Sequence, residues 1–166
     1  MTLVEPDLRA LFADIRLRQH VLGGTRPSPK VITGVHHASM GRAPSNCRLV
    51  RPDRRWKNGV YRARIHIMGS DGRYHPKGVA STMFPDEWSK NEVFAAGRVA
   101  LEDAIRSGDF NVRTGRWNGI AFGLWNSRVH RYHISGYADF RGGTVTRVRT
   151  FFPTKSRSTE PGGREL

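Results

Sequence analysis

The sequence contains very little cysteine and no long apolar run. Its one cysteine, Cys47, excludes an internal disulfide and a metal site built on several cysteines. We expect Cys47 to be a packed thiol rather than a nucleophile. No apolar run approaches the roughly 18 residues that a membrane-spanning helix needs, so we expect no membrane anchor. Met1 is followed by an acidic, amphipathic stretch, and no signal peptide is predicted.

Acidic residues are also scarce. Lysine and arginine number 28 against 14 aspartates and glutamates, which gives a formal net charge of +14. Such an excess attracts polyanions, so nucleic acid is the expected partner and an acidic protein the second choice. An anionic membrane surface ranks third, because no basic amphipathic helix is visible. Charge supplies affinity but no chemistry, and a non-catalytic nucleic-acid-binding domain would be equally basic.

Two segments have the pattern of helices. Residues 5–22 begin with Pro6 and Asp7 in the first turn and stop at the glycines at 23 and 24. Residues 85–107 contain Ser89 and Glu92 at capping-box spacing and stop at Gly108. The predicted apolar stripes are Leu8, Leu11, Phe12, Ile15 and Leu22 in the first helix, and Val93, Ala96, Ala100, Leu101, Ala104 and Ile105 in the second.

The other regular segments have the pattern of antiparallel strands. Residues 59–68 alternate, with Tyr61, Ala63, Ile65 and Ile67 on one side and Arg62, Arg64 and His66 on the other. A turn at residues 70–72 predicts a returning strand at 73–79, and residues 47–56 read as a connector. Residues 120–125, 129–137 and 144–152 predict a meander, whose last strand places Thr146, Val148, Thr150 and Phe152 on one face.

These elements predict an α+β fold: an N-terminal helix, a second helix and an antiparallel sheet. We expect a single domain over residues 1–153 and a flexible, polar tail over residues 154–166.

Histidines gather at the end of the first helix and in the following loop. His20 lies in the last predicted turn, and His36 and His37 are adjacent within the loop over residues 23–47, where Val31, Ile32 and Val35 predict a short strand. Loops of this length are usually functional or disordered, and the adjacent histidines favour function. Imidazoles titrate near neutral pH, so two that face each other can act as base and acid. The other histidines are expected to be structural or surface groups: His66, His75, His130 and His133.

Three motifs follow one another in a recognisable order. The first is His20-Val-Leu-Gly-Gly with Gly34-Val-His36-His37; the second runs from Lys77-Gly-Val-Ala-Ser81-Thr82-Met-Phe84-Pro85 to Trp88-Ser89; the third is Thr150-Phe151-Phe152-Pro153. Over roughly residues 19–153, this order resembles the bacterial EndoU nuclease family, which has H-I-L-x-G, G-G-H, K-S-x-F-P-x-x-W-S and a closing T-A-Y-P or T-A-F-P. Here Phe152 replaces the frequent tyrosine, and three residues separate Lys77 from Ser81.

The resemblance implies a uridylate-preferring endoribonuclease with the fold of barnase-like RNase toxins. Its reaction would be a transesterification, in which the ribose 2′-hydroxyl attacks phosphorus and leaves a 2′,3′-cyclic phosphate and a 5′-hydroxyl, with no metal or cofactor required. It further implies a toxin domain, secreted or delivered as part of a larger protein into the cytoplasm of a target cell. The implied partners are RNA, either single-stranded or tRNA, and an acidic cognate immunity protein.

Carried over by position, the resemblance makes His20, His36 and Lys77 catalytic, with His37 as the alternative to His36. Which histidine is base and which is acid stays open, with a preference for His36 as base. Thr150 and Phe152 would contact the base. Ser81 and Thr82 would either hydrogen-bond locally or contact a phosphate.

Two other functions remain alternatives. One is a non-catalytic basic domain that binds nucleic acid. The other is a toxin that uses a metal, either a nuclease or of the deaminase type. The sequence lacks the H-x-E and P-C-x-x-C signature of zinc deaminases, which argues against that class.

Overall fold

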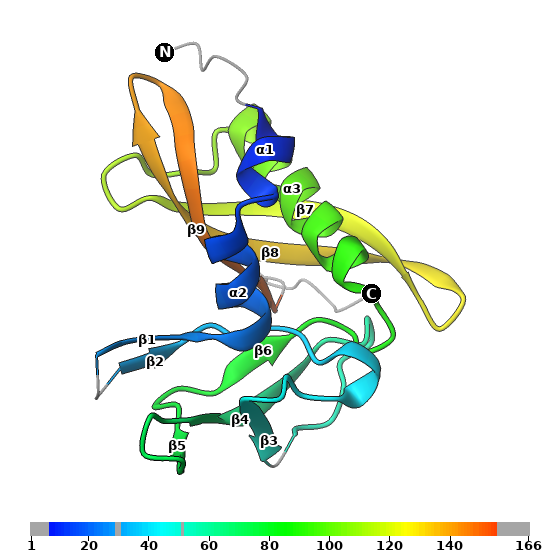
Figure 1. Ribbon diagram of the computed structural model, residues 1–166. Coiled ribbons are helices and arrows are strands. Elements are labelled where there is room, and N and C mark those ends of the chain that lie inside the picture. Colours follow the sequence, from blue (N-terminus) through cyan, green and yellow to red (C-terminus); the bar gives the residue numbers. More distant parts are fainter. Residues whose placement is uncertain (1–6, 29–30, 51, 156–166) are drawn as a thin grey trace, which may run out of the picture.

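The computed structural model describes residues 7–28, 31–50 and 52–155, and Figure 1 shows its arrangement. Three α-helices pack against a three-stranded antiparallel sheet, and a smaller antiparallel sheet lies below them in this view. The predicted α+β class is therefore confirmed. The predicted helix start at residues 5 and 6 and residues 156–166 of the predicted tail lie outside the described residues. The predicted tail began one residue too early, because Thr154 still belongs to the last strand.

The prediction of one continuous N-terminal helix is wrong. The chain forms α1 (Leu8–Phe12) and α2 (Ile15–Gly23), and Asp14 begins the second helix by accepting a hydrogen bond from the Arg16 amide. Aspartate is a strong N-cap, so it starts a new helix with a changed direction. The stripe changes as a result: Ile15 is 65% exposed, whereas Leu17 and Val21 are buried.

The large sheet and α3 form the main hydrophobic core. Helix α3 (Lys90–Ser107) has the predicted capping box and ends at Gly108 in the left-handed region. It packs on β7 (Arg116–Trp125), which pairs with β8 (Arg128–Arg141), which in turn pairs with β9 (Thr144–Thr154). We call this the main core; its largest buried side chains include Phe84, Trp117, Tyr132 and Phe151. Phe84 and Trp88, from the segment before α3, also belong to the main core.

A bulge in β9 corrects the predicted face of that strand. Thr150 pairs with Tyr137, but Val148 pairs with the next residue, Ala138, so Arg149 is an extra residue in the ladder. A bulge moves the side chains beyond it to the opposite face. Val148 and Phe151 therefore both enter the main core, while Thr150 and Phe152 share the other face.

The small sheet consists of β3 (Cys47–Val50), β4 (Tyr61–Met68), β5 (Tyr74–Pro76) and β6 (Ser81–Met83). The predicted alternation in β4 is confirmed, because the odd-numbered residues from Tyr61 to Ile67 are buried. The connector prediction is wrong at its start, where residues 47–50 form β3. The small core consists of Val35, Ala38, Cys47, Tyr61, Ala63, Ile65, Ile67 and Met83.

The predicted histidine loop contains short regular elements. A hairpin of β1 (Thr25–Ser28) and β2 (Val31–Thr33) is followed by the short helix η1 (Ser39–Gly41). Between β2 and η1, residues 34–38 are buried. This buried segment and β6 lie where the main core meets the small core, since α2 and β6 both contact β9. None of the described helices is long and apolar enough to cross a membrane.

Candidate active site

The segment containing His36 is held against the C-terminal end of α2 by backbone contacts. The His20 carbonyl accepts hydrogen bonds from Gly24 N (3.0 Å) and Val35 N (3.1 Å), and Val21 O accepts one from His36 N (2.7 Å). Gly34 has φ +84°, and any side chain at that position would collide with the His20 carbonyl. A glycine is therefore required here for the chain to approach the helix end so closely.

Val35 carries backbone strain beside this glycine. Its φ of 61° lies in the left-handed region, which a β-branched residue adopts only when its surroundings enforce it. Val35 is fully buried in the small core, and its amide is bonded to His20. Packing and hydrogen bonding thus enforce the turn that places the next residue, His36, opposite β6 and β9.

The hydrogen bonding of His36 fixes its tautomer. Its Nδ1 lies 2.9 Å from the Thr82 carbonyl, which can only accept, so Nδ1 carries the hydrogen and Nε2 carries the lone pair. His36 is 7% exposed as a residue, and the centroid of its ring lies 5.3 Å from that of the Phe152 ring. Burial lowers the pKa of His36 to about 3, and the Lys77 charge acts in the same direction. The neutral imidazole is therefore the stable form at neutral pH.

Lys77 enters the same cluster from the segment after β5. Its backbone amide continues the sheet ladder by donating to Ile65 O (2.7 Å). The ammonium donates to Gly34 O (3.0 Å) and to Ser81 Oγ (2.6 Å), and Ser81 Oγ in turn donates to Gly34 O (3.2 Å). An ammonium has three donors, so these contacts leave one for an anion. Burial lowers the pKa of Lys77 to about 8.

His20 completes the group of titratable side chains. It lies in the last turn of α2 and is partly buried. Burial lowers the pKa of His20, and the nearby Lys77 charge lowers it further. His20 also acts on His36, because its charge contributes to the lowered pKa of His36. His20, His36 and Lys77 therefore form one electrostatically coupled cluster.

Strand β9 brings Phe152 and Thr150 to this cluster. Phe152 packs beside the His36 ring, and Thr150 lies two residues earlier on the same face of the strand. The Thr150 hydroxyl is buried and has no hydrogen-bond partner within the described part of the chain. Buried hydroxyls normally find a partner, so the unsatisfied Thr150 hydroxyl is an exception that calls for an explanation.

His37 faces different surroundings from His36. It is 2% exposed, and the groups that influence its pKa are the backbone at Trp88 and Pro85, the Asp86 carboxylate and Lys90. Burial is the largest influence and lowers the pKa of His37. The structure therefore places His37, the alternative catalytic residue, beside the start of α3 rather than with Lys77 and His20.

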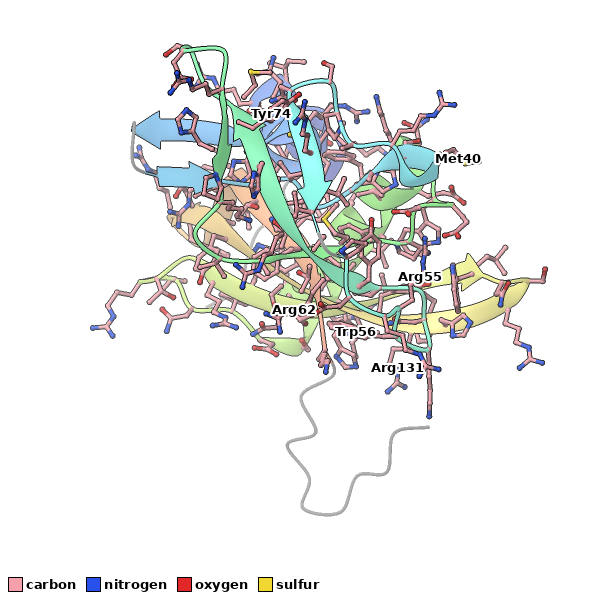
Figure 2. All side chains as sticks on the ribbon, turned by 90° about the horizontal axis from the view of Figure 1, so that it is seen from below. Met40, Arg55, Trp56, Arg62, Tyr74 and Arg131 are labelled. Atoms are coloured by element: carbon pink, nitrogen blue, oxygen red, sulfur yellow. The ribbon has the colours of Figure 1, made fainter. Side chains whose placement is uncertain are left out.

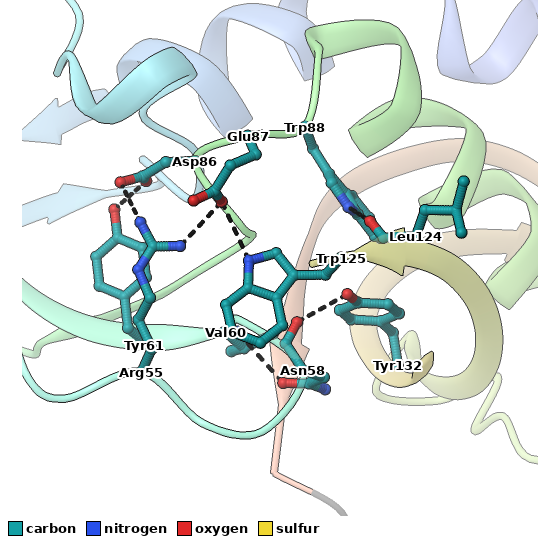
Figure 3. Close-up of polar contacts among 10 residues, drawn as sticks. All are labelled: Arg55, Asn58, Val60, Tyr61, Asp86, Glu87, Trp88, Leu124, Trp125 and Tyr132. Carbon is teal, nitrogen blue, oxygen red and sulfur yellow. Dashed lines mark hydrogen bonds and ion pairs between the residues drawn. The ribbon is translucent and has the colours of Figure 1, made fainter. Parts of the chain in front are cut away.

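A polar network beyond His37 holds the segment before α3 in place (Figure 3). Arg55 forms salt bridges with Asp86 (2.8 Å) and Glu87 (2.9 Å), and Tyr61 also donates to Asp86. Trp125 at the end of β7 donates to Glu87 (3.2 Å). Directly before these residues, the Phe84 amide donates to His36 O (2.9 Å). The network thus ties the small sheet and β7 to the segment that supports His36.

Sequence reasoning missed the backbone acceptors of this site. The Gly34 carbonyl receives both Lys77 and Ser81, and the Thr82 carbonyl orients His36. Carbonyls leave no residue signature, although Gly34 within the Gly-Val-His-His motif marks the first one. Ser81 is 1% exposed and contacts Lys77 locally. No group of three or more His, Cys, Asp or Glu side chains within the described ranges is arranged to hold a metal ion.

Together these groups indicate an enzyme that acts on nucleic acid. Imidazoles can transfer protons, and a buried ammonium can bind a phosphate anion. The sequence profile of the bacterial EndoU nuclease family matches residues 16–155, which is most of the chain. The protein belongs to this family of nucleases, and the resemblance noted in the sequence is confirmed. No curated protein matches the chain.

Burial of His36 predicts a pH-dependent stability. The ordinary pKa of 6.5 in the unfolded chain exceeds the folded value of about 3, so below about pH 6.5 the unfolded state binds more protons. The free energy of unfolding should fall as pH falls, by about 1 kcal/mol per pH unit for this one imidazole. Urea unfolding at pH 7, 6 and 5 measures the slope.

The comparison variants for this measurement are His36→Gln and His75→Gln. His75 lies beside Asp71 at a turn of the small sheet. We expect His36→Gln to have a shallower slope than wild type, and His75→Gln serves as the matched control for the loss of one imidazole outside the site. Equal slopes in wild type and His36→Gln would contradict a buried, neutral His36.

Proposed function

We propose that this nuclease is an endoribonuclease that cleaves RNA on the 3′ side of uridylate by transesterification. The observation that carries the proposal is the His36–Thr82 hydrogen bond, which leaves the Nε2 lone pair of a neutral imidazole as a base. The buried Lys77 ammonium beside it is suited to a negatively charged reaction centre. RNA supplies its own nucleophile, the 2′-hydroxyl, so no reactive serine or cysteine is needed.

In the proposed reaction, His36 Nε2 accepts the proton of the 2′-hydroxyl. The bond between O2′ and phosphorus forms, the bond between phosphorus and O5′ breaks, and protonated His20 donates a proton to the leaving O5′. The products are a 2′,3′-cyclic phosphate and a 5′-hydroxyl. Lys77 stabilises the extra negative charge of the phosphorane. A phosphodiester anion in the site raises the pKa of His20, which favours its protonated form during the reaction.

For base recognition, we assign Thr150 and Phe152. The unpartnered Thr150 hydroxyl can both donate and accept, which matches the edge of a pyrimidine base. The Phe152 ring, on the same face, offers a surface for base stacking beside the His36 ring. Ser81 acts in this scheme by orienting Lys77, and Thr82 by orienting His36 through its carbonyl.

The decisive experiment is cleavage of a single-stranded oligoribonucleotide with one uridine, followed by analysis of the ends. We expect cleavage 3′ of the uridine with a cyclic phosphate end, and no cleavage when that uridine is 2′-deoxy. His20→Ala, His36→Ala and Lys77→Ala should each lower the rate about 10²-fold or more. His75→Ala is the control and should retain the rate. An intact oligonucleotide would support the alternative, a non-catalytic basic binding domain.

The lowered pKa of Lys77 predicts a specific alkaline effect. As pH rises through about 8, the free enzyme loses the ammonium, so kcat/KM should fall about tenfold per further pH unit from this group. Arginine stays charged, so Lys77→Arg should lack this added fall even if its rate is lower. Profiles from pH 7 to 10 for the two enzymes check this. If the pH profiles of wild type and Lys77→Arg fell in parallel, the Lys77 ammonium would not be the group that stabilises the charge of the phosphorane.

We further propose that the chain is the toxic domain of a bacterial effector, acting in the cytoplasm of a target cell and neutralised by an acidic immunity protein. The net charge of +14 supports an acidic partner. Expression inside a bacterium should arrest growth for wild type and His75→Ala, but not for His36→Ala. Growth arrest by all three proteins, wild type included, or by none of them, would contradict a toxin that acts through RNA cleavage.

A further inference from the structure

The outer face of the small sheet is basic. Pairing across the strands sets Arg48 opposite His66, Val50 opposite Arg64, and Arg62 opposite Thr82. Opposed residues in an antiparallel pair project from the same face, so these side chains lie on the face away from the small core. Tyr74 joins them because it pairs with Met68. We call Arg48, Arg62, Arg64, His66 and Tyr74 the basic face.

An arginine and an aromatic ring are stacked on this face. The Arg48 guanidinium lies 3.9 Å from the centre of the Tyr74 ring, although the two strands flank β4 on opposite sides. Arg48 therefore reaches across β4 to cover the tyrosine. Aromatic rings and guanidinium planes are the two kinds of side-chain surface on which unpaired nucleobases stack.

The charges of this face are not neutralised by the protein. Arg48, Arg62 and Arg64 are exposed, and no salt bridge joins them to a carboxylate within the described part of the chain. The paired positions of the face contain no acidic residue; Asp53 and Asp71 lie at its margins, and Asp71 is paired with His75. A row of unpaired guanidinium groups attracts a polyanion.

The basic face and the candidate active site share strand β6. Thr82, opposite Arg62, orients His36 through its carbonyl, and Lys77 follows the end of β5. From Arg62 to His66 the face extends about 13 Å along β4 at the usual rise of a strand. In Figure 2, the view from below the molecule, Arg62 and Tyr74 lie toward opposite ends of β4.

We propose that the basic face binds single-stranded RNA that extends beyond the cleaved phosphodiester, with the arginines contacting phosphates and a base stacking on the Arg48–Tyr74 pair. RNA fits better than an acidic protein, because the face combines spaced cations with a stacking surface and adjoins a site for phosphodiesters. The proposal takes its ligand from the proposed function, but its test does not require cleavage.

The test measures binding of a fluorescent 20-nucleotide 2′-O-methyl RNA, which has no free 2′-hydroxyl, by anisotropy at several salt concentrations. The triple variant R48Q/R62Q/R64Q should bind at least about tenfold more weakly at low salt. The slope of log Kd against log salt should decrease by about 0.7 for each lost phosphate contact. Tyr74→Ala should weaken binding about fivefold or more with little change in the slope.

A second triple variant, R113Q/R141Q/R147Q, controls for the same loss of charge. These exposed arginines belong to the β8–β9 hairpin and the loop before β7, at the end of the molecule opposite the small sheet (Figure 1). The control should bind the RNA nearly as well as wild type. Equal weakening by the two triple variants would overturn the proposal, because affinity would then follow net charge alone. Thermal unfolding confirms that each variant is folded.

Two further measurements separate the remaining outcomes. A uridine-containing dinucleotide is too short to reach the face, so R48Q/R62Q/R64Q should keep the wild-type kcat/KM on this substrate. On a 20-nucleotide RNA, the KM of the same variant should rise. Equal losses on both substrates would place the arginines in the reaction itself and overturn the proposal. Polyglutamate that displaces RNA at equal charge concentration would assign the face to an acidic protein instead. If nothing is cleaved but the binding results hold, the proposed function fails and the basic face stands.

Discussion

The site depends on one close backbone contact, in which the turn at Gly34 meets the carbonyl end of α2. Helix ends leave carbonyls without helical partners, and here the Val21 carbonyl accepts the His36 amide of the returning chain. The His20 carbonyl accepts the Val35 amide in addition to the Gly24 amide. The absence of a side chain at Gly34 makes the approach possible. The same contact sets the relative positions of His20 on the helix and His36 on the turn, and it directs the Gly34 carbonyl to Lys77.

Burial of the site's titratable side chains both lowers the stability of the fold and shifts their pKa values. Removing imidazoles and an ammonium from water disfavours their charged forms, which destabilises the fold in acid and lowers the pKa of His36 and Lys77. A neutral imidazole with an assigned lone pair is free to accept a proton at neutral pH, and an incompletely satisfied ammonium is a strong anion site. The strained Val35 belongs to the same pattern, since unfavourable local conformations concentrate at functional sites.

Local sequence signals were sufficient to predict most helices and strands, but not the break between the first two helices or the bulge in the last strand. The alternation in β4 and the capping box of α3 depend on neighbouring residues only, and both were predictable. The break at Asp14 was missed because apolar residues continue on both sides of it, and the bulge at Arg149 because it depends on the pairing strand. Motif order indicated the residues that gather at the site, but separating His36 from His37 required tertiary contacts that sequence spacing does not contain.

The position of the site between two hydrophobic cores has a consequence for when the protein can act. His20 extends from a helix packed on the main core, while Lys77 directly follows β5 and Ser81 lies in β6, both beside the small core. The candidate site is therefore complete only when both cores are folded and packed against each other. A change that loosens the contact between the two cores would separate these groups without altering any one of them.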